Sequence, residues 1–177
     1  MKRIKTRGLK QTILFSLFIF TLIANFGGCC VYSFTGASVP QHLKTIAIPI
    51  AEDKSGAGEP GLRELLTTTL TQNFIDDNTL QVASKTNANS LLECTIISLT
   101  DAPAVVSAGE TVQSRRITIS VQAVFKDLVE RKTIFNKTFS NYGDYSTSGS
   151  AVERNNAIQA AVKNISQDIL LAVVSGW

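Results

Sequence analysis

Apolar and polar residues alternate along several stretches of the chain, most regularly from Arg115 to Phe125. One face of this stretch carries only apolar side chains, at Ile117, Ile119, Val121, Ala123 and Phe125. Hydroxyl and amide side chains alternate with them on the other face. The pattern predicts an antiparallel strand with one face buried and one face in water.

Four further stretches carry shorter or less regular strand patterns. Residues 44–50 alternate through three isoleucines, but Pro49 cannot donate to a ladder and therefore favours an edge position or an early end of the strand. Residues 80–82 form a short strand pattern. Residues 91–99 are apolar on both sides over part of their length, which predicts a central strand. Residues 133–139 follow a turn and are predicted to pair with the regular strand as a hairpin.

Apolar residues at helical spacing predict two amphipathic helices. The first begins near Pro60 and ends at 76–78. Its apolar stripe consists of Leu62, Leu65, Leu66, Leu70 and Phe74. The second follows a capping box at 150–153 and closes near Gly176. Its stripe consists of Ile158, Ala161, Val162, Ile165, Ile169 and Val173. Turn-forming residues at 142–149 predict a loop before this second helix.

Polar, glycine- or proline-bearing connections at 52–58, 84–90 and 101–110 separate the predicted elements. The order of elements is strand, helix, two to four strands, helix. It predicts a two-layer α/β sandwich of about four mainly antiparallel strands, with two helices packed on one face. The other face of the sheet is polar and open to a partner. We place this single domain at residues 43–177.

The first 28 residues differ in composition from the rest of the chain. They hold five basic residues and no acidic one, whereas residues 29–177 hold 12 basic and 14 acidic residues. The net charge of +3 therefore belongs to the leader, and the remaining chain has no excess of cations with which to bind a nucleic acid. Residues 13–24 form an apolar stretch, shorter than the roughly 20 residues of a transmembrane helix. We predict a signal peptide at 1–28 and export of the chain.

Two glycines precede a pair of cysteines directly after this apolar stretch. The sequence 26–29, Phe-Gly-Gly-Cys, is similar to the lipobox of bacterial lipoproteins, in which small residues precede an acylated cysteine. Cys29 is a better acceptor than Cys30, because acylation of Cys30 would put Gly27 where a large apolar residue belongs. We predict lipidation of Cys29, a lipidated tether at 29–42, and a membrane anchor that does not span the bilayer. A plain signal peptide with a cysteine nearby is the alternative.

The chain contains no recognisable catalytic or metal-binding motif. No HExxH, CxxC, GxSxG or phosphate-loop pattern occurs. We therefore expect no catalytic residue, no metal and no cofactor besides the covalent lipid on Cys29. His42, the one histidine, is expected to be a surface or tether residue. Cys94 is predicted to be a buried apolar residue, with a disulfide to Cys30 as the alternative.

Two adjacent arginines are the candidate contact residues for a ligand or partner. Arg115 and Arg116 begin the most regular strand. Neighbours on a strand point to opposite faces, so at least one guanidinium lies on the open face, where it could meet an anionic group. A solvated end of the strand is the simpler interpretation of the same pair.

Four stretches of the chain occur in an order that resembles one known family. The lipobox is followed by Cys-Cys-Val-Tyr-Ser-Phe-Thr-Gly-Ala-Ser at 29–38, and the others are 115–121, 139–145 and 172–177. Together they are similar to the LptE family of lipopolysaccharide-assembly lipoproteins, in the form typical of Bacteroidetes and Chlorobi. Cys30 stands where that pattern has glycine.

The resemblance implies a two-helix, four-stranded α/β sandwich without enzymatic activity. It implies an outer-membrane lipoprotein on the periplasmic face, with a triacylated, palmitate-bearing Cys29. Such a protein binds the LptD β-barrel as plug and assembly partner and assists lipopolysaccharide transport. The resemblance assigns no lipopolysaccharide-contacting residue.

Two other functions remain open at this point. One is a periplasmic lipoprotein that activates a cell-wall synthase, of the LpoB type, and the other is a ligand-binding lipoprotein. A synthase activator needs a long tether across the periplasm. At most about a dozen residues separate Cys29 from the first predicted strand, a reach of at most ~40 Å, which favours a partner close to the membrane.

Overall fold

The computed structural model of the chain describes residues 39–104 and 114–175. The predicted signal peptide, Cys29, Cys30 and the tether as far as residue 38 lie outside the described residues. Most of the predicted turn at 101–110 also lies outside them. The described residues belong to one compact unit, and Val39 already packs against its core.

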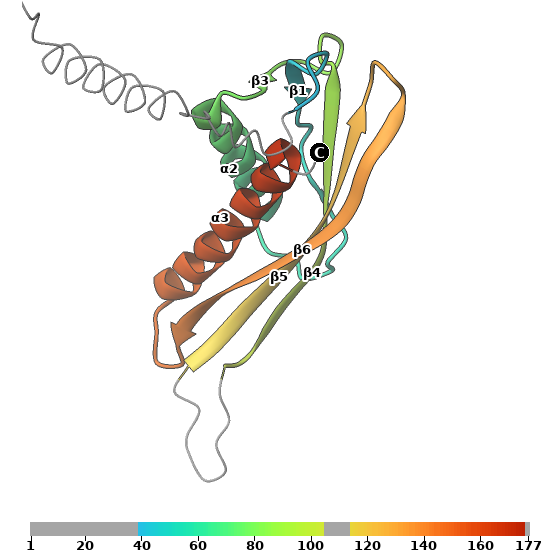
Figure 1. The fold of residues 1–177 in the computed structure, drawn as a ribbon. Helices are drawn as coiled ribbons and strands as arrows, with labels where there is room; N and C mark the ends of the chain where they lie inside the picture. The colour runs from blue at the N-terminus through green and yellow to red at the C-terminus, as the bar shows by residue number, and fades with distance from the viewer. Residues whose placement is uncertain (1–38, 105–113, 176–177) are drawn as a thin grey trace, which may run out of the picture. The chain divides into compact units, whose positions relative to one another are not determined.

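Three long antiparallel strands form most of one sheet (Figure 1). These are β4 (Ser90–Pro103), β5 (Ser114–Asp127) and β6 (Lys132–Ser146). β5 lies between the other two and pairs with both along its whole length. All five apolar residues predicted on one face of β5 are buried, so that strand prediction is confirmed.

Three short strands complete the sheet in parallel pairing. These are β1 (Thr45–Ala47), β2 (Glu52–Asp53) and β3 (Gln81–Val82). The order is β3-β1-β4-β5-β6, with β2 also paired to β4, so the sheet has six strands rather than about four. The expected α/β class holds. The predicted number of strands was wrong because a two-residue strand such as β2 is too short to show alternation. β2 lies in a polar segment that was predicted as a loop.

Two helices cover one face of this sheet, α2 (Leu62–Asp77) and α3 (Ala151–Ser175) (Figure 1). The predicted stripe of α3 is buried in full, and that of α2 is buried except for the half-buried Leu65. α3 is long and apolar enough to cross a membrane by length and composition alone. Because one stripe of it is buried against the sheet and α2, α3 is a core helix of the sandwich.

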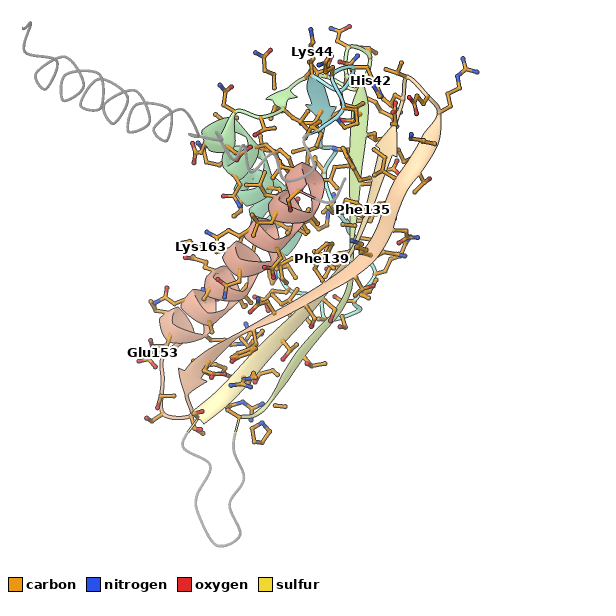
Figure 2. The ribbon with its side chains drawn as sticks, in the orientation of Figure 1. His42, Lys44, Phe135, Phe139, Glu153 and Lys163 are labelled. Carbon is orange, nitrogen blue, oxygen red and sulfur yellow. The ribbon has the colours of Figure 1, made fainter. Side chains whose placement is uncertain are left out.

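Aromatic side chains of β5 and β6 extend the core under α3. The ring centroids of Phe125 and Phe135 lie 5.7 Å apart, and those of Phe135 and Phe139 lie 6.4 Å apart. Figure 2 labels Phe135 and Phe139 along β6, and both are partly buried against the core. Edge-to-face and tilted rings at such distances pack favourably.

The loop predicted at 142–149 is wrong over its first half, because β6 continues to Ser146. Gly143 pairs with Ile117 in the β5–β6 ladder, and the side facing α3 has no room for a side chain. A Cβ atom on Gly143 would lie 2.1 Å from the carbonyl oxygen of Ala157 in α3. This glycine therefore permits close contact between helix and strand and does not form a turn.

We predict that Gly143→Ala lowers the free energy of unfolding by about 1–3 kcal/mol or more, since α3 must move away from β6. Urea or thermal unfolding of the full chain measures this. Thr138→Ala, an exposed position on the same strand, is the control and should change stability by less than about 0.5 kcal/mol. Equal stability of the two variants would contradict the proposed packing role of Gly143.

Candidate functional site

Arg115 and Arg116 point to opposite faces of the sheet, as strand geometry predicts. Arg115 lies opposite Tyr145 and belongs to the face that the helices cover. Arg116 lies opposite Asp144 and belongs to the face without helices, which we call the open face. The two arginines therefore belong to two different clusters.

The cluster on the helix side is centred on Asp101 of β4, and we call it the Asp101 network. Arg115 Nε donates to Asp101 Oδ1 at 2.8 Å, and the Tyr145 hydroxyl donates to Asp101 Oδ2 at 2.7 Å. Arg154 of α3 lies 3.6 Å from the same carboxylate and donates to Glu59 at 2.9 Å. The network ties β4, β5, β6, α3 and the segment before α2 together with matched charges.

The geometry changes the acidity of Asp101. Burial acts to raise the pKa of this carboxyl, but hydrogen bonds from Tyr145 and Arg115 and the charges of Arg115 and Arg154 outweigh it, so the pKa is lowered. Asp101 therefore remains ionised, and it favours the charged form of both arginines. This network is a structural clamp whose guanidinium groups already have partners.

The cluster on the open face consists of Arg116, Tyr142 and Asp144, and we call it the open-face cluster. Arg116 donates to both oxygens of Asp144, from Nε at 2.7 Å and from Nη2 at 2.8 Å. The guanidinium carbon also lies 3.6 Å from the centre of the Tyr142 ring, a close cation–π contact. Tyr142 is 48% exposed. Arginine and tyrosine are both enriched at the hot spots of protein interfaces, and this cluster exposes one of each.

Most of the remaining open face is polar and uncharged, with Val124 of β5 as an apolar exception. Along β5 and β6, Ser120 donates to Ser140 at 3.1 Å and Gln122 donates to Asn136 at 2.9 Å. The charged pair Lys126–Glu93 lies farther along the same face, with 2.5 Å between Nζ and Oε2. Hydroxyl and amide groups can both donate and accept hydrogen bonds. The face is therefore suited to contact with another polar surface.

Cys94 is buried, as predicted. Burial raises the pKa of its thiol to about 12. A thiol of this acidity remains protonated at neutral pH and is a poor nucleophile. Cys30, the alternative disulfide partner, lies outside the described residues.

His42 is not a free surface or tether residue, contrary to our expectation. Its Nε2 lies 2.7 Å from Oδ2 of Asp127, whose side chain is completely buried at the end of β5. Glu130 Oε1 lies 3.9 Å from the same nitrogen. The turn predicted after β5 places Asp127 near Glu130. No sequence pattern connects either acid to His42, because Asp127 is 85 residues away from it.

The fold and these clusters define a class of protein, the two-layer α/β sandwich with a long antiparallel sheet. Within residues 39–104 and 114–175, no helix covers the polar face of this sheet. Residues 43–173 match the family model LptE, described as lipopolysaccharide-assembly. The chain therefore belongs to the LptE family, and the resemblance noted from its motifs is confirmed. Among curated proteins, no sequence matches this chain.

Solved structures share this fold. One is the hypothetical protein CT253 from Chlamydia trachomatis, with a TM-score of 0.58 at 10% identity, covering 74% of this chain and 95% of that one. Another is protein XCC0632 from Xanthomonas campestris, with a TM-score of 0.55 at 12% identity, covering 78% and 91%. At these identities the likeness concerns the fold alone.

We predict that Asp101→Asn lowers the free energy of unfolding by about 1–3 kcal/mol at neutral pH, because two arginines lose the negative charge that they share. The lowered pKa sets the pH dependence. The contribution of Asp101 is complete above the unfolded pKa of about 3.9 and is lost as the pH falls through the lower folded value. The free energies of unfolding of the wild type and the variant should therefore become equal at acidic pH.

The exposed Asp144, on the open face, offers a matched control for this experiment. Asp144→Asn should cost less stability, because a solvent-exposed ion pair contributes little. Urea denaturation curves at a series of pH values measure both variants. A loss for Asp101→Asn that is the same at every pH would contradict the role given to its charge.

Proposed function

We propose that this chain is a non-enzymatic outer-membrane lipoprotein that binds an LptD-type β-barrel and assists lipopolysaccharide transport to the cell surface. The observation that carries the proposal is the match to the lipopolysaccharide-assembly family over residues 43–173. Cys29 holds the chain, through its lipid, on the periplasmic face of the outer membrane. The bound barrel receives this domain as plug and assembly partner.

The length of the anchor segment supports a partner close to the membrane. Ten residues lead from Cys29 to Val39, which is already packed against the core. Even a fully extended segment of this length spans only about 35 Å. The domain therefore works near the membrane, where a barrel is accessible and a synthase across the periplasm is not.

The open face is the surface on which we place the barrel contact. The lumen of a transmembrane barrel is lined by polar side chains. A wall of hydroxyl and amide groups, with Arg116 and Tyr142 at one end, offers hydrogen-bond partners to such a lining. Arg115 belongs to the proposed site only as a positioning residue, since the Asp101 network holds it on the other side of the sheet.

Co-purification tests the partner and the surface together. From detergent-solubilised outer membranes of the source bacterium, the tagged full chain should capture a β-barrel that mass spectrometry identifies. The double variant Arg116→Ala with Tyr142→Ala should weaken capture at least about tenfold, the effect of losing an interface hot spot. Lys163→Ala, an exposed position on α3 away from the open face, is the control and should bind like wild type.

The outcomes of this experiment separate two errors. Capture of a cell-wall synthase, or of no envelope protein, would contradict the proposed partner. Capture of the barrel in equal amount by the double variant would instead contradict the open-face cluster as the contact. Circular dichroism of each variant verifies that the α/β fold is retained.

The anchor is tested separately through Cys29. We expect Cys29→Ala to leave the membrane fraction, because the acyl chains are lost, and Cys30→Ala to remain with it. Intact-mass analysis of the native product should give the mass of a triacylated cysteine. An unmodified thiol at position 29 would contradict this part of the proposal.

A further inference from the structure

His42, Asp127 and Glu130 bring three potential metal ligands together at the turn between β5 and β6. The imidazole Nε2 lies 2.7 Å from Asp127 Oδ2 and 3.9 Å from Glu130 Oε1. The three ligand atoms all lie within 4.8 Å of one another. Figure 2 shows His42 near one end of the sheet, far from Glu153 at the start of α3.

Other groups orient both carboxylates toward the imidazole. Asp127 Oδ1 accepts hydrogen bonds from the backbone N–H groups of Val129, at 2.8 Å, and of Glu130, at 2.9 Å. Lys132 Nζ lies 2.5 Å from Glu130 Oε2. Each acid thus has one oxygen held by the protein and the other turned to His42. Metal-binding side chains are typically oriented by such outer hydrogen bonds and ion pairs.

The burial of the three side chains suits an ion bound at the edge of the domain. The Asp127 side chain is completely buried, whereas His42 is 34% exposed and Glu130 is 48% exposed. One ligand is therefore deep and fixed, and two lie at the rim, where an ion and a water molecule have access. This arrangement leaves a fourth coordination position toward solvent.

We propose that this grouping, the His42 cluster, is a site for a divalent transition-metal ion, and that zinc fits it best. Zinc accepts imidazole nitrogen and carboxylate oxygen at about 2.0–2.2 Å in a tetrahedron, which sets ligand atoms about 3.3 Å apart. The separations of 2.7 and 3.9 Å lie on either side of that value. The ion would lie between His42 Nε2 and Asp127 Oδ2, which face each other directly.

Metal binding here would link distant parts of the chain. His42 belongs to the segment that precedes β1, whereas Asp127 ends β5 and Glu130 lies in the turn to β6. A zinc ion joining them fixes the start of the folded domain to the β5–β6 hairpin. Its binding energy then adds to the stability of the folded chain.

Zinc titration of the full chain tests the proposal. The protein is purified in detergent with a tag free of histidine, in a Cys30→Ser background that removes a competing thiol. Calorimetry should give one zinc ion per chain, and zinc should raise the midpoint of thermal unfolding. Because the sequence contains a single histidine, a shift of its imidazole NMR signals reports ligation directly.

Variants in the same background identify the ligands. His42→Gln and Glu130→Gln should each weaken zinc binding by at least about tenfold. Glu64→Gln, an exposed acid in the first turn of α2, is the matched control and should bind like the parent. Asp127 is left unchanged, because its replacement would also remove the hydrogen bonds that form the hairpin turn.

Two results would overturn the metal site. One is the absence of saturable zinc binding by the parent protein, and the other is unchanged affinity in His42→Gln. In either case, the cluster is only a hydrogen-bonded contact that holds the start of the domain to β5. Neither result bears on the barrel partner, which co-purification tests independently.

Discussion

The register of β5 is the constraint on which the rest of this structure depends. Its buried residues, from Ile117 to Phe125, keep one face against the helices while the strand pairs with β4 and β6 on its two edges. A slip by one residue would bury the hydroxyl face and expose the apolar one. The same register turns Arg115 toward α3 and Arg116 away from it. The core and the open-face cluster thus follow from a single alternation.

The parts of the fold that the sequence predicted well are those in which one pattern repeats many times. The α3 stripe and the β5 face each repeat over several turns or residue pairs, so chance matches are rare. β6 was predicted too short because Gly143 and Asp144 are typical turn residues. Gly143 is required instead by a contact with Ala157, a residue of another element, and local patterns contain no information about it.

The same distinction applies to the candidate sites: some of their features follow from the local sequence, and others depend on residues far away in the chain. The opposite directions of Arg115 and Arg116 follow from strand geometry alone. Their partners do not, because Asp101 lies on β4 and Asp144 lies on β6, and only the packed structure brings them together. His42 is the extreme case, since its carboxylate partner is 85 residues away. Strand alternation therefore locates the arginines but not the groups that hold them.

The two arginines differ in their capacity to exchange one anionic partner for another. Asp101 accepts from Arg115 and Tyr145 and lies beside Arg154, so removing Arg115 from it would disturb several contacts at once. Asp144 pairs with Arg116 and is itself 42% exposed, and water can replace that arginine at little cost. The chain after the leader has more acidic than basic residues, so long-range attraction cannot gather anionic partners. Contact with a phosphate or an acidic side chain must then be short-range, and Arg116 is the arginine of the pair that can make it.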